Sequence, residues 1–377
     1  MVIQLLLSAS TAVSLAFFIR SYATIRKFKP SGVPVVGQNL PTVSVCIAAR
    51  NETHALAQSL ERILKNDYPK LEILVLDDSS TDDTSLIIKS FASAGVRFVA
   101  GDSLPPGWLG KNHAYQTLIN EASGDLILFL DVDTFIQRDT TARLVDMMSS
   151  PQVSMVSVLP RRTDIEHTSA LLGTLRYHWE LLLGTRKNPP AASALWIVEK
   201  AALLKDGVGL NNYGMAVRPE RHLARQLHRQ GAYRYFVSSK ELGVTFEKRL
   251  RSQWETAVRL YYPITGRNIV QSLLFMFVLG LFIAPFVVIL LLNWDKTASQ
   301  WALTLIALNL VSFWIVSRRL NAKPILIFKL IFWPLMIIQE IVLLLRSIYM
   351  HVTGSVTWKG RRVSAQPISH ERLEINE

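Results

Sequence analysis

The stretch GDLILFLDVDT (124–134) contains a run of large apolar residues, 126–130, followed by two aspartates that are separated by one residue. A short, continuous apolar run between polar residues is typical of a strand buried in a parallel sheet. Asp131 and Asp133 then leave the sheet at the carboxyl end of that strand. Ligands of open parallel sheets bind at this edge, so the stretch predicts both the core of the fold and the position of a site.

The same pattern recurs on the N-terminal side of this stretch. We expect strands at 42–48, 71–78 and 96–100, and helices at 54–66, 82–94 and 112–122. Strands rich in Val, Ile and Leu that alternate with amphipathic helices predict an α/β fold with a doubly wound, mainly parallel sheet covered on both faces.

Polar clusters follow these expected strands where each strand ends. Arg50, Asn51 and Glu52 follow the first strand, and Asp77 and Asp78 end the second. Carboxylates crowded at one edge repel one another unless a cation or hydrogen-bond donors neutralise them. We therefore expect a divalent metal, Mg²⁺ or Mn²⁺, held by Asp131 and Asp133, with its remaining ligands supplied by water and a diphosphate.

Two simpler interpretations remain open for these acidic clusters. Asp133 and Thr134 favour helix N-caps, and Ser80 or Thr81 could cap the helix expected at 82–94. Lys111 follows the glycine-containing loop 107–110 at the start of a helix, where backbone N–H groups and a cation favour phosphate binding.

The ends of the chain are apolar. Residues 2–19 carry no charge and are followed by Arg20, so we expect an uncleaved transmembrane helix rather than a signal peptide. Residues 269–292, 301–316 and 324–345 are further apolar segments. The last contains Lys329, Pro334 and Glu340, and we expect it to dip into the membrane at Pro334 and return.

The chain thus divides into five expected parts. They are an N-terminal anchor with its basic flank (1–29), a linker (30–41), a catalytic domain (42–265), membrane segments (266–350) and a basic cytoplasmic tail (351–377).

Composition agrees with a membrane protein. The 377 residues include 41 Lys and Arg against 29 Asp and Glu, a net charge of +12, yet half of all residues are hydrophobic. This excludes a disordered chain, and the single cysteine, Cys46, excludes a disulfide scaffold. The positive charge gathers beside the apolar segments, so we assign it to membrane orientation and expect no nucleic-acid partner.

Several motifs together resemble family 2 glycosyltransferases of the GT-A fold. They are ARNE (49–52), DDSSTDDT (77–84), LPPGWLGKNHA (104–114), GDLILFLDVDT (124–134) and WKGRR (358–362). The similarity covers residues 40–262 and the tail motif. It extends to membrane lipid-modifying members such as the 4,4'-diaponeurosporenoate and hopanoid-associated glycosyltransferases.

This resemblance implies inverting transfer of a sugar, most often from a UDP-sugar, to an acceptor hydroxyl. It also implies roles for the rim residues. The nucleotide-sugar site would comprise Arg50, Glu52, Asp77, Asp78, Lys111 and Asp131, with Asp78 at the uridine and Lys111 near the base or diphosphate. Asp131 and Asp133 would hold the metal and the diphosphate.

The chain departs from the family pattern at two places. The family's catalytic aspartate corresponds to Glu220, preceded by Pro219 where the family has an acidic residue. We expect Glu220 to be the base; an ion pair with the flanking Arg218 is the alternative role, and His222 is a second candidate. At 253–254 a glutamine stands before Trp254 where many members carry arginine, and we expect Trp254 to stack on the sugar or acceptor.

The leading hypothesis is a multi-pass protein of the inner cell membrane that transfers a sugar to a lipid acceptor at the cytoplasmic face. A processive polysaccharide synthase, a non-catalytic membrane protein that keeps the fold, and a nucleotidyltransferase are the alternatives.

Overall fold

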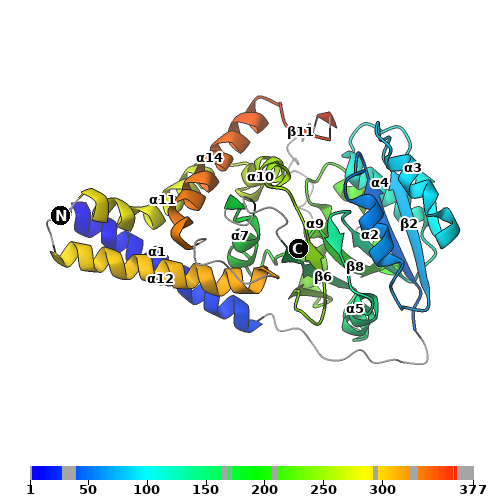
Figure 1. Cartoon of the computed structure of the whole chain (residues 1–377), viewed down its shortest axis with the longest axis horizontal. Coiled ribbons are helices and arrows are strands. Elements are labelled where there is room, and N and C mark those ends of the chain that lie inside the picture. The colour runs from blue at the N-terminus through cyan, green and yellow to red at the C-terminus, as the bar shows by residue number, and fades with distance from the viewer. Residues whose placement is uncertain are drawn as a thin grey trace, which may run out of the picture.

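The computed structural model of the chain describes residues 2–27, 40–163, 169, 172–205, 210–291, 296–322, 330–359, 361 and 362. Figure 1 shows an α/β part built around a twisted sheet and a group of long helices that extends away from it. Of the expected linker 30–41, only residues 40 and 41 are described, and residues 363–377 of the expected tail lie outside the described residues.

A seven-stranded sheet in the order β3-β2-β1-β4-β8-β6-β9 forms the centre of the α/β part. Its strands are β1 (Val43–Ala49), β2 (Leu71–Asp77), β3 (Val96–Ala100), β4 (Leu126–Leu130), β6 (Met155–Leu159), β8 (Leu195–Glu199) and β9 (Tyr233–Val237). β8 runs antiparallel to both of its neighbours, and the other pairs are parallel. The expected mainly parallel sheet is confirmed, with three strands, β6, β8 and β9, that the sequence pattern did not predict.

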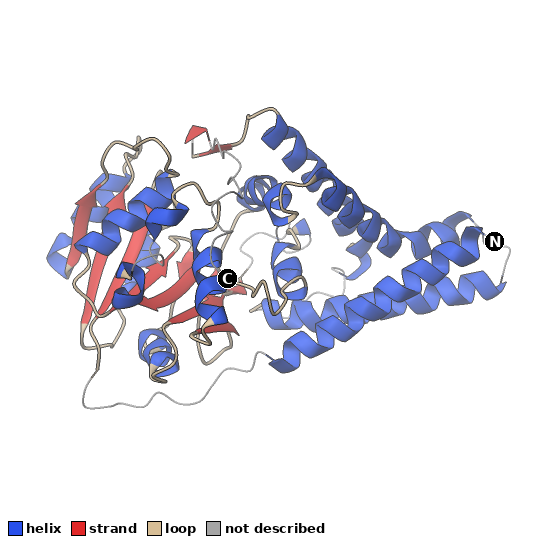
Figure 2. Cartoon of the chain, turned by 180° about the vertical axis from the view of Figure 1, so that it is seen from behind, coloured by secondary structure: helices blue, strands red, loops and turns tan. Residues whose placement is uncertain are grey.

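Each face of the sheet has its own hydrophobic core, because successive strand residues point to opposite faces. Val45 and Ile47 pack on the face covered by α2 (Leu56–Ile63), α3 (Thr84–Ser90) and α5 (Thr140–Met148). Cys46 and Leu74 pack on the other face, against α4 (Gly110–Glu121) and α9 (Pro219–Arg229). Figure 2 shows helices on both sides of the strands, as the doubly wound arrangement requires.

Short elements complete the α/β part. A three-stranded sheet contains β5 (Thr134–Phe135), β10 (Thr245–Phe246) and β7 (Arg161–Arg162), and a hairpin contains β11 (Thr357–Trp358) and β12 (Arg361–Arg362). The remaining short helices are the 3₁₀ turns Ala92–Ala94 and Leu210–Tyr213, α7 (Arg176–Leu182), α8 (Lys200–Leu204) and α10 (Leu250–Ile264).

Both capping interpretations of the acidic clusters are wrong. Thr134 begins strand β5, so Asp133 and Thr134 do not start a helix. Neither Ser80 nor Thr81 caps α3, because the helix begins at Thr84 with Asp83 at its N-cap position and no side-chain cap hydrogen bond there. The preceding residue, Asp82, accepts the backbone N–H of Thr84 at 3.1 Å and its hydroxyl at 2.6 Å through Oδ1. Asp133 therefore has no structural role as a helix cap.

In the part of the chain that the structure describes, four helices are long and apolar enough to cross a membrane. They are α1 (Val2–Lys27), α11 (Ile269–Leu291), α12 (Lys296–Leu320) and α14 (Trp333–Val352). The first three correspond to the apolar segments at 2–19, 269–292 and 301–316. α14 begins later than the expected segment 324–345, and Pro334 stands in its first turn rather than at a bend.

An aromatic cluster joins all four long helices. Trp333 of α14 stacks on Phe17 of α1 at 6.0 Å between ring centroids and lies 4.6 Å from Phe313 of α12. Its ring also meets Phe282 of α11 edge-on at 6.0 Å. α14 starts inside the helix group and then diverges from it toward the hairpin β11–β12 (Figure 1).

Candidate active site

The loops after β1 and β2 form the first part of the site. Asn51 and Ser79, which follow these strands, have positive φ angles of 52° and 53°, a conformation that non-glycine residues rarely adopt. Arg50 holds the two loops together, because its guanidinium donates to the carbonyl oxygens of Asp78 and Ser79, the latter at 2.8 Å. Strained backbone of this kind concentrates at functional sites.

Asp78 is the buried acid of this rim, with only 5% of its surface exposed. Both of its carboxylate oxygens accept hydrogen bonds from Arg361 Nη1, at 2.8 and 2.9 Å. Gly110 permits this approach, since a Cβ there would lie 2.8 Å from both Asp78 Oδ2 and Arg361 Nη1. Asp77, in contrast, lies in the turn itself, where its Oδ1 accepts the N–H of Ser80 at 3.2 Å.

Asp131 and Asp133 each pair with a lysine. Asp131 Oδ1 lies 2.5 Å from Lys111 Nζ, and Asp133 Oδ2 lies 3.1 Å from Lys248 Nζ. Burial acts to raise the pKa of Asp131, but Lys111 outweighs this effect with help from Lys248, so the pKa lies below its usual range. Asp131 is therefore an ionised acceptor at neutral pH.

Asp131 and Asp133 offer carboxylate oxygens, which are ligands that suit a divalent cation. Their carboxylate oxygens face the same two cavities, and hard oxygen ligands are those that Mg²⁺ and Mn²⁺ take. No group of three or more His, Cys, Asp or Glu side chains among the described residues could enclose a metal ion. A cation here must complete its coordination with water or with a bound phosphate.

Lys111 lies in the first turn of α4, after the loop that contains Gly107 at φ +83°. Burial acts to lower the pKa of Lys111, but its pairing with Asp131 dominates and raises the pKa. Lys111 is thus a fixed positive charge between the start of a helix and Asp131, which is the geometry of a phosphate site.

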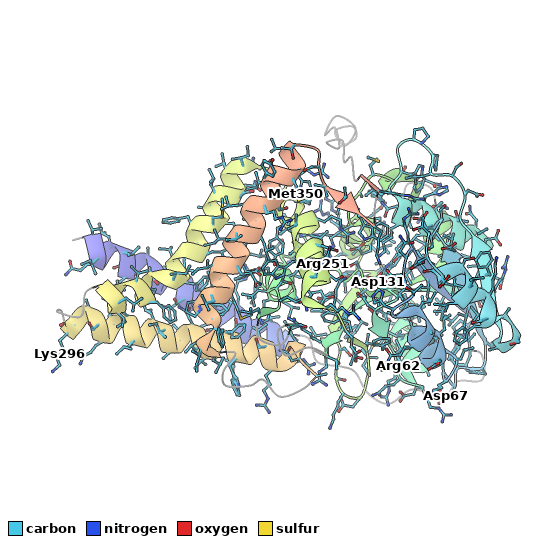
Figure 3. All side chains as sticks on the ribbon, turned by 45° about the horizontal axis from the view of Figure 1, so that its top comes forward. Arg62, Asp67, Asp131, Arg251, Lys296 and Met350 are labelled. Atoms are coloured by element: carbon cyan, nitrogen blue, oxygen red, sulfur yellow. The ribbon has the colours of Figure 1, made fainter. Side chains whose placement is uncertain are left out.

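Two cavities meet at Asp131 and Asp133. The first cavity, of about 470 Å³, lies between the start of α4, the start of α9 and the hairpin β11–β12. The second cavity, of about 780 Å³, extends from the two aspartates along α10 to the C-terminal half of α14. Figure 3 labels three residues that line the second cavity. They are Asp131 after β4, Arg251 of α10 and Met350 of α14.

Glu220 lines the first cavity but is held by an ion pair. α9 begins at Pro219, as expected, and Glu220 is only 2% exposed. Its Oε1 accepts from Arg218 Nε at 2.9 Å, and Arg218 Nη2 also lies 2.8 Å from Oε1 of Glu180. The ion pair considered for Glu220 is therefore present, in a buried Glu–Arg–Glu cluster, and the same residue borders the cavity.

His222 lies apart from both cavities. Its ring stacks on Tyr213 at 4.9 Å between centroids. Burial, together with Arg225 and Arg221, lowers the pKa of His222 to about 4. A neutral histidine against a tyrosine ring, outside the cavity linings, is a structural residue rather than a base.

Gln253 and Trp254 point in different directions from α10. Gln253 is buried, and its Nε2 donates to the backbone oxygen of Lys248 at 2.9 Å. Trp254 is 37% exposed and lines the second cavity, so it is free to contact a ligand there.

The hairpin β11–β12 covers the rim of β1 and β2. Lys359 Nζ lies 3.0 Å from Glu52 Oε1 and donates to the backbone oxygen of Asn51 at 2.9 Å. Burial raises the pKa of Glu52, and Lys359 offsets only part of this effect. Trp358 contacts Arg259 of α10, whose guanidinium carbon is 5.4 Å from the ring centroid.

Four cations of this site, Lys248, Arg259, Lys359 and Arg361, were not predicted. WKGRR (358–362) was recognised as a motif, but nothing in the spacing of the chain connects position 361 to Asp78 or position 359 to Glu52. Lys248 and Arg259 had no sequence signal beyond their closeness to Trp254.

Comparison with known proteins relates part of the chain to a glycosyltransferase family. Residues 44–194 match the family described as glycosyl transferase family 2. Over 124 residues, 32% of each chain, the protein is 29% identical to a 4,4'-diaponeurosporenoate glycosyltransferase of Staphylococcus aureus. Over 126 residues it is 34% identical to an N-acetylglucosaminyltransferase of Rhizobium meliloti, a match that covers 33% of this chain and 29% of that one. These matches span about a third of the length of the relatives.

Among solved structures, the chain resembles a mannosyltransferase from Pyrobaculum calidifontis in complex with GDP-Man and Mn²⁺. The TM-score is 0.59 at 19% sequence identity, and the similarity covers 92% of this chain and 99% of that one. At this level of identity the comparison shows a shared fold, which is that of the GT-A glycosyltransferases.

Proposed function

Because residues 44–194 form a family 2 glycosyltransferase domain, we propose that the protein is a membrane-bound, inverting glycosyltransferase. It transfers one sugar, a hexose, from a UDP-sugar to the hydroxyl or carboxyl group of a lipid at the cytoplasmic face of the cell membrane. One observation carries the proposal: the cavity at Asp131 and Asp133 continues along α10 to α14, a helix of membrane-spanning length.

The donor occupies the rim that the structure forms after β1, β2 and β4. Asp78 accepts hydrogen bonds from the uridine, which requires Arg361 to leave its carboxylate. Arg50 and Glu52 shape the nucleotide pocket, whereas Asp77 supports it by holding the turn at Ser80.

The diphosphate lies at Asp131 and Asp133, which hold the divalent cation. When bound, that cation neutralises the negative charge that develops on the diphosphate leaving group. Asp131 and Asp133 would hold such a cation, and Lys111 and Lys248, which lie 2.5 and 3.1 Å from these carboxylates, would bind the diphosphate. Lys111 is only half-buried, with 30% of its side chain exposed, so solvent screens part of its electrostatic interaction with the leaving group.

Contacts just after α12 and after α14 support a cytoplasmic catalytic domain. Arg161 Nη2 donates to the backbone oxygen of Asn321, just after α12, at 2.8 Å. After α14, the chain returns to the same α/β part through Arg361 and Asp78. We therefore propose that the chain from Asn321 to the hairpin begins and ends at the cytoplasmic face, as the positive-inside rule also predicts.

The test is sugar transfer by the full-length protein in detergent, with a set of UDP-sugars, GDP-mannose and a bacterial lipid extract as acceptor. We expect one UDP-sugar to yield a lipid that carries a single sugar in the organic phase. A water-soluble polymer would instead support a processive synthase. Absence of transfer and of donor hydrolysis with every nucleotide sugar would contradict the proposal.

Glu220 is the base that we propose for a hydroxyl acceptor, because its carboxylate borders the cavity of the reacting groups. Glu220→Gln keeps an acceptor for Arg218 and removes the proton acceptor. With an alcohol acceptor we expect kcat to fall by about 100-fold or more. With a carboxylate acceptor, which is already ionised, we expect little change.

Rates for the two acceptor types are the measurement, compared at saturating donor. An equal loss with both acceptors would show that Glu220 acts only as the structural partner of Arg218.

A further inference from the structure

The charged side chains that line the second cavity do not balance. Each of its four acidic residues has a cation partner within 3.1 Å. The pairs are Glu52 with Lys359, Asp131 with Lys111, Asp133 with Lys248, and Glu255 with Arg251. Two further arginines in the lining, Arg259 and Arg346, form no ion pair or hydrogen bond with any described residue. Among the described residues, the lining of the second cavity therefore has an excess of two positive charges.

Arg259 lies where the two cavities meet, since it lines both. Burial lowers the pKa of this guanidinium to about 10, and Arg176 acts in the same direction. A guanidinium removed from water without a carboxylate partner is costly. This cost is recovered when an anion binds beside Arg259.

Arg346 is an exposed residue of α14 that lines the second cavity. The neighbouring residue, Ser347, is buried, and its hydroxyl accepts the backbone N–H of Tyr262 at 2.9 Å. This bond fixes α14 against α10, so Arg259 and Arg346 project into one cavity from two helices held in register.

We propose that Arg259 and Arg346 bind the anionic head group of the acceptor, and that the acceptor is a membrane amphiphile ending in a carboxylate or a phosphate monoester. This proposal rests on the proposed function, which allows a hydroxyl or a carboxyl group on the acceptor, and it selects an anionic group. Arginine suits the role because its planar fork matches the oxygens of both groups.

The negative charges of the donor diphosphate do not need Arg259 or Arg346 as partners. Lys111 and Lys248 already occupy the positions at Asp131 and Asp133, and they match the two negative charges of the diphosphate once a divalent cation binds the aspartates. Arg259 and Arg346 remain for a second anion, and the acceptor is the other substrate of the reaction.

The apolar lining of the second cavity identifies this anion as part of an amphiphile. Trp254, Met350 and Val356 line it beside the arginines. α14 then continues from this lining to the aromatic cluster around Trp333, inside the group of long helices. α14 also exposes apolar side chains along its length, among them Leu335, Ile338 and Val342, and a lipid chain with its charged end at Arg346 would lie against them.

An anionic acceptor also agrees with the ion pair of Glu220. The acceptor oxygen attacks the anomeric carbon, the bond from that carbon to the diphosphate oxygen breaks, and UDP leaves with the bonding electrons. No proton needs to be removed, because the attacking oxygen is already ionised. Glu220 can then remain bound to Arg218 throughout the reaction.

The test measures binding of three amphiphiles that share one chain: geranylgeranoic acid, geranylgeranyl phosphate and geranylgeraniol. The full-length protein in detergent is titrated without donor. We expect the acid, the phosphate or both to bind about tenfold or more tightly than the alcohol, the size of one charge-assisted hydrogen bond. Arg259→Gln and Arg346→Gln each remove this advantage.

Arg318→Gln is the matched control, since Arg318 is an exposed arginine at the end of another long helix, α12, and lines neither cavity. It leaves the advantage intact. The acid and phosphate arms identify which head group is the ligand. Equal binding of all three amphiphiles, or an advantage that survives both substitutions, would overturn the proposal.

Binding is measured without turnover, so the outcome is independent of the proposed activity. If no nucleotide sugar is turned over but the anionic amphiphiles bind through Arg259 and Arg346, the proposed function fails and the anion site stands. If sugar is transferred efficiently to the alcohol, the anion site fails and the glycosyltransferase stands.

Discussion

Replacing Asp133 by asparagine is expected to lower the rate of sugar transfer by about 1,000-fold, which corresponds to about 4 kcal/mol of transition-state stabilisation. The amide keeps the size of the side chain and loses the charge that holds the divalent cation. Asp131→Asn should have an effect of the same order, because the two carboxylates face the same cavities. The measurement is the initial rate with a saturating acceptor across a range of metal concentrations.

Asp139→Asn is the control for these two variants. Asp139 pairs with Arg143 at the start of α5 and lines neither cavity, so its loss should leave transfer unchanged. Folding of all three variants is compared by thermal unfolding. Wild-type rates in a folded Asp133→Asn protein would show that the metal site is assigned to the wrong residues.

Replacing Glu340 by alanine is expected to lower the free energy of unfolding by about 3 kcal/mol, because buried donors lose their acceptor. The carboxylate of Glu340 accepts hydrogen bonds from the backbone N–H of Leu175 at 3.0 Å, Trp179 Nε1 at 2.7 Å and the Tyr261 hydroxyl at 2.6 Å. These bonds join α14 to α7 and α10, so one substitution weakens the attachment of α14 to the α/β part.

Thermal unfolding of the full-length protein in detergent measures this effect. Leu345→Ala is the matched control, because Leu345 lies on the same helix with 51% of its surface exposed. It should change stability by less than about 0.5 kcal/mol. If Glu340→Ala and Leu345→Ala unfold at the same temperature, Glu340 does not anchor α14.

Local sequence patterns were sufficient for the N-terminal half of the sheet. The apolar run before Asp131 and the similar runs before Arg50 and Asp77 each predict a buried strand, and parallel strands bring their ends to one edge. β8 was not predicted. Its apolar run, Leu195–Glu199, does not show in which direction the strand runs. Only its pairing with β4 and β6 fixes it as antiparallel.

The acidic half of the site was predicted more successfully than the basic half. Asp78, Asp131 and Asp133 directly follow their strands, so their position depends on local structure alone. Lys248 and Arg361 reach those acids from distant parts of the chain, and a lysine or arginine in a basic sequence carries no sign of its partner.

The sequence shows that Glu340 is unusual, but it does not show which groups bind its carboxylate. In the sequence, its charge within an apolar segment argues against a simple membrane span. The structure adds that the carboxylate is saturated by three donors from α7, α10 and the loop before α7. Those donors lie 79 to 165 residues before Glu340 in the chain, so no local pattern could identify them.

The most direct test of the proposed function is mass spectrometry of lipid extracts from cells that contain equal amounts of wild-type protein or Asp133→Asn. The account predicts a lipid that carries one added hexose, present with the wild-type protein and absent with the variant. This lipid should release a carboxylate or a phosphate lipid when the sugar is removed. Identical sets of glycosylated lipids in the two extracts would contradict the assignment of this protein as a lipid glycosyltransferase.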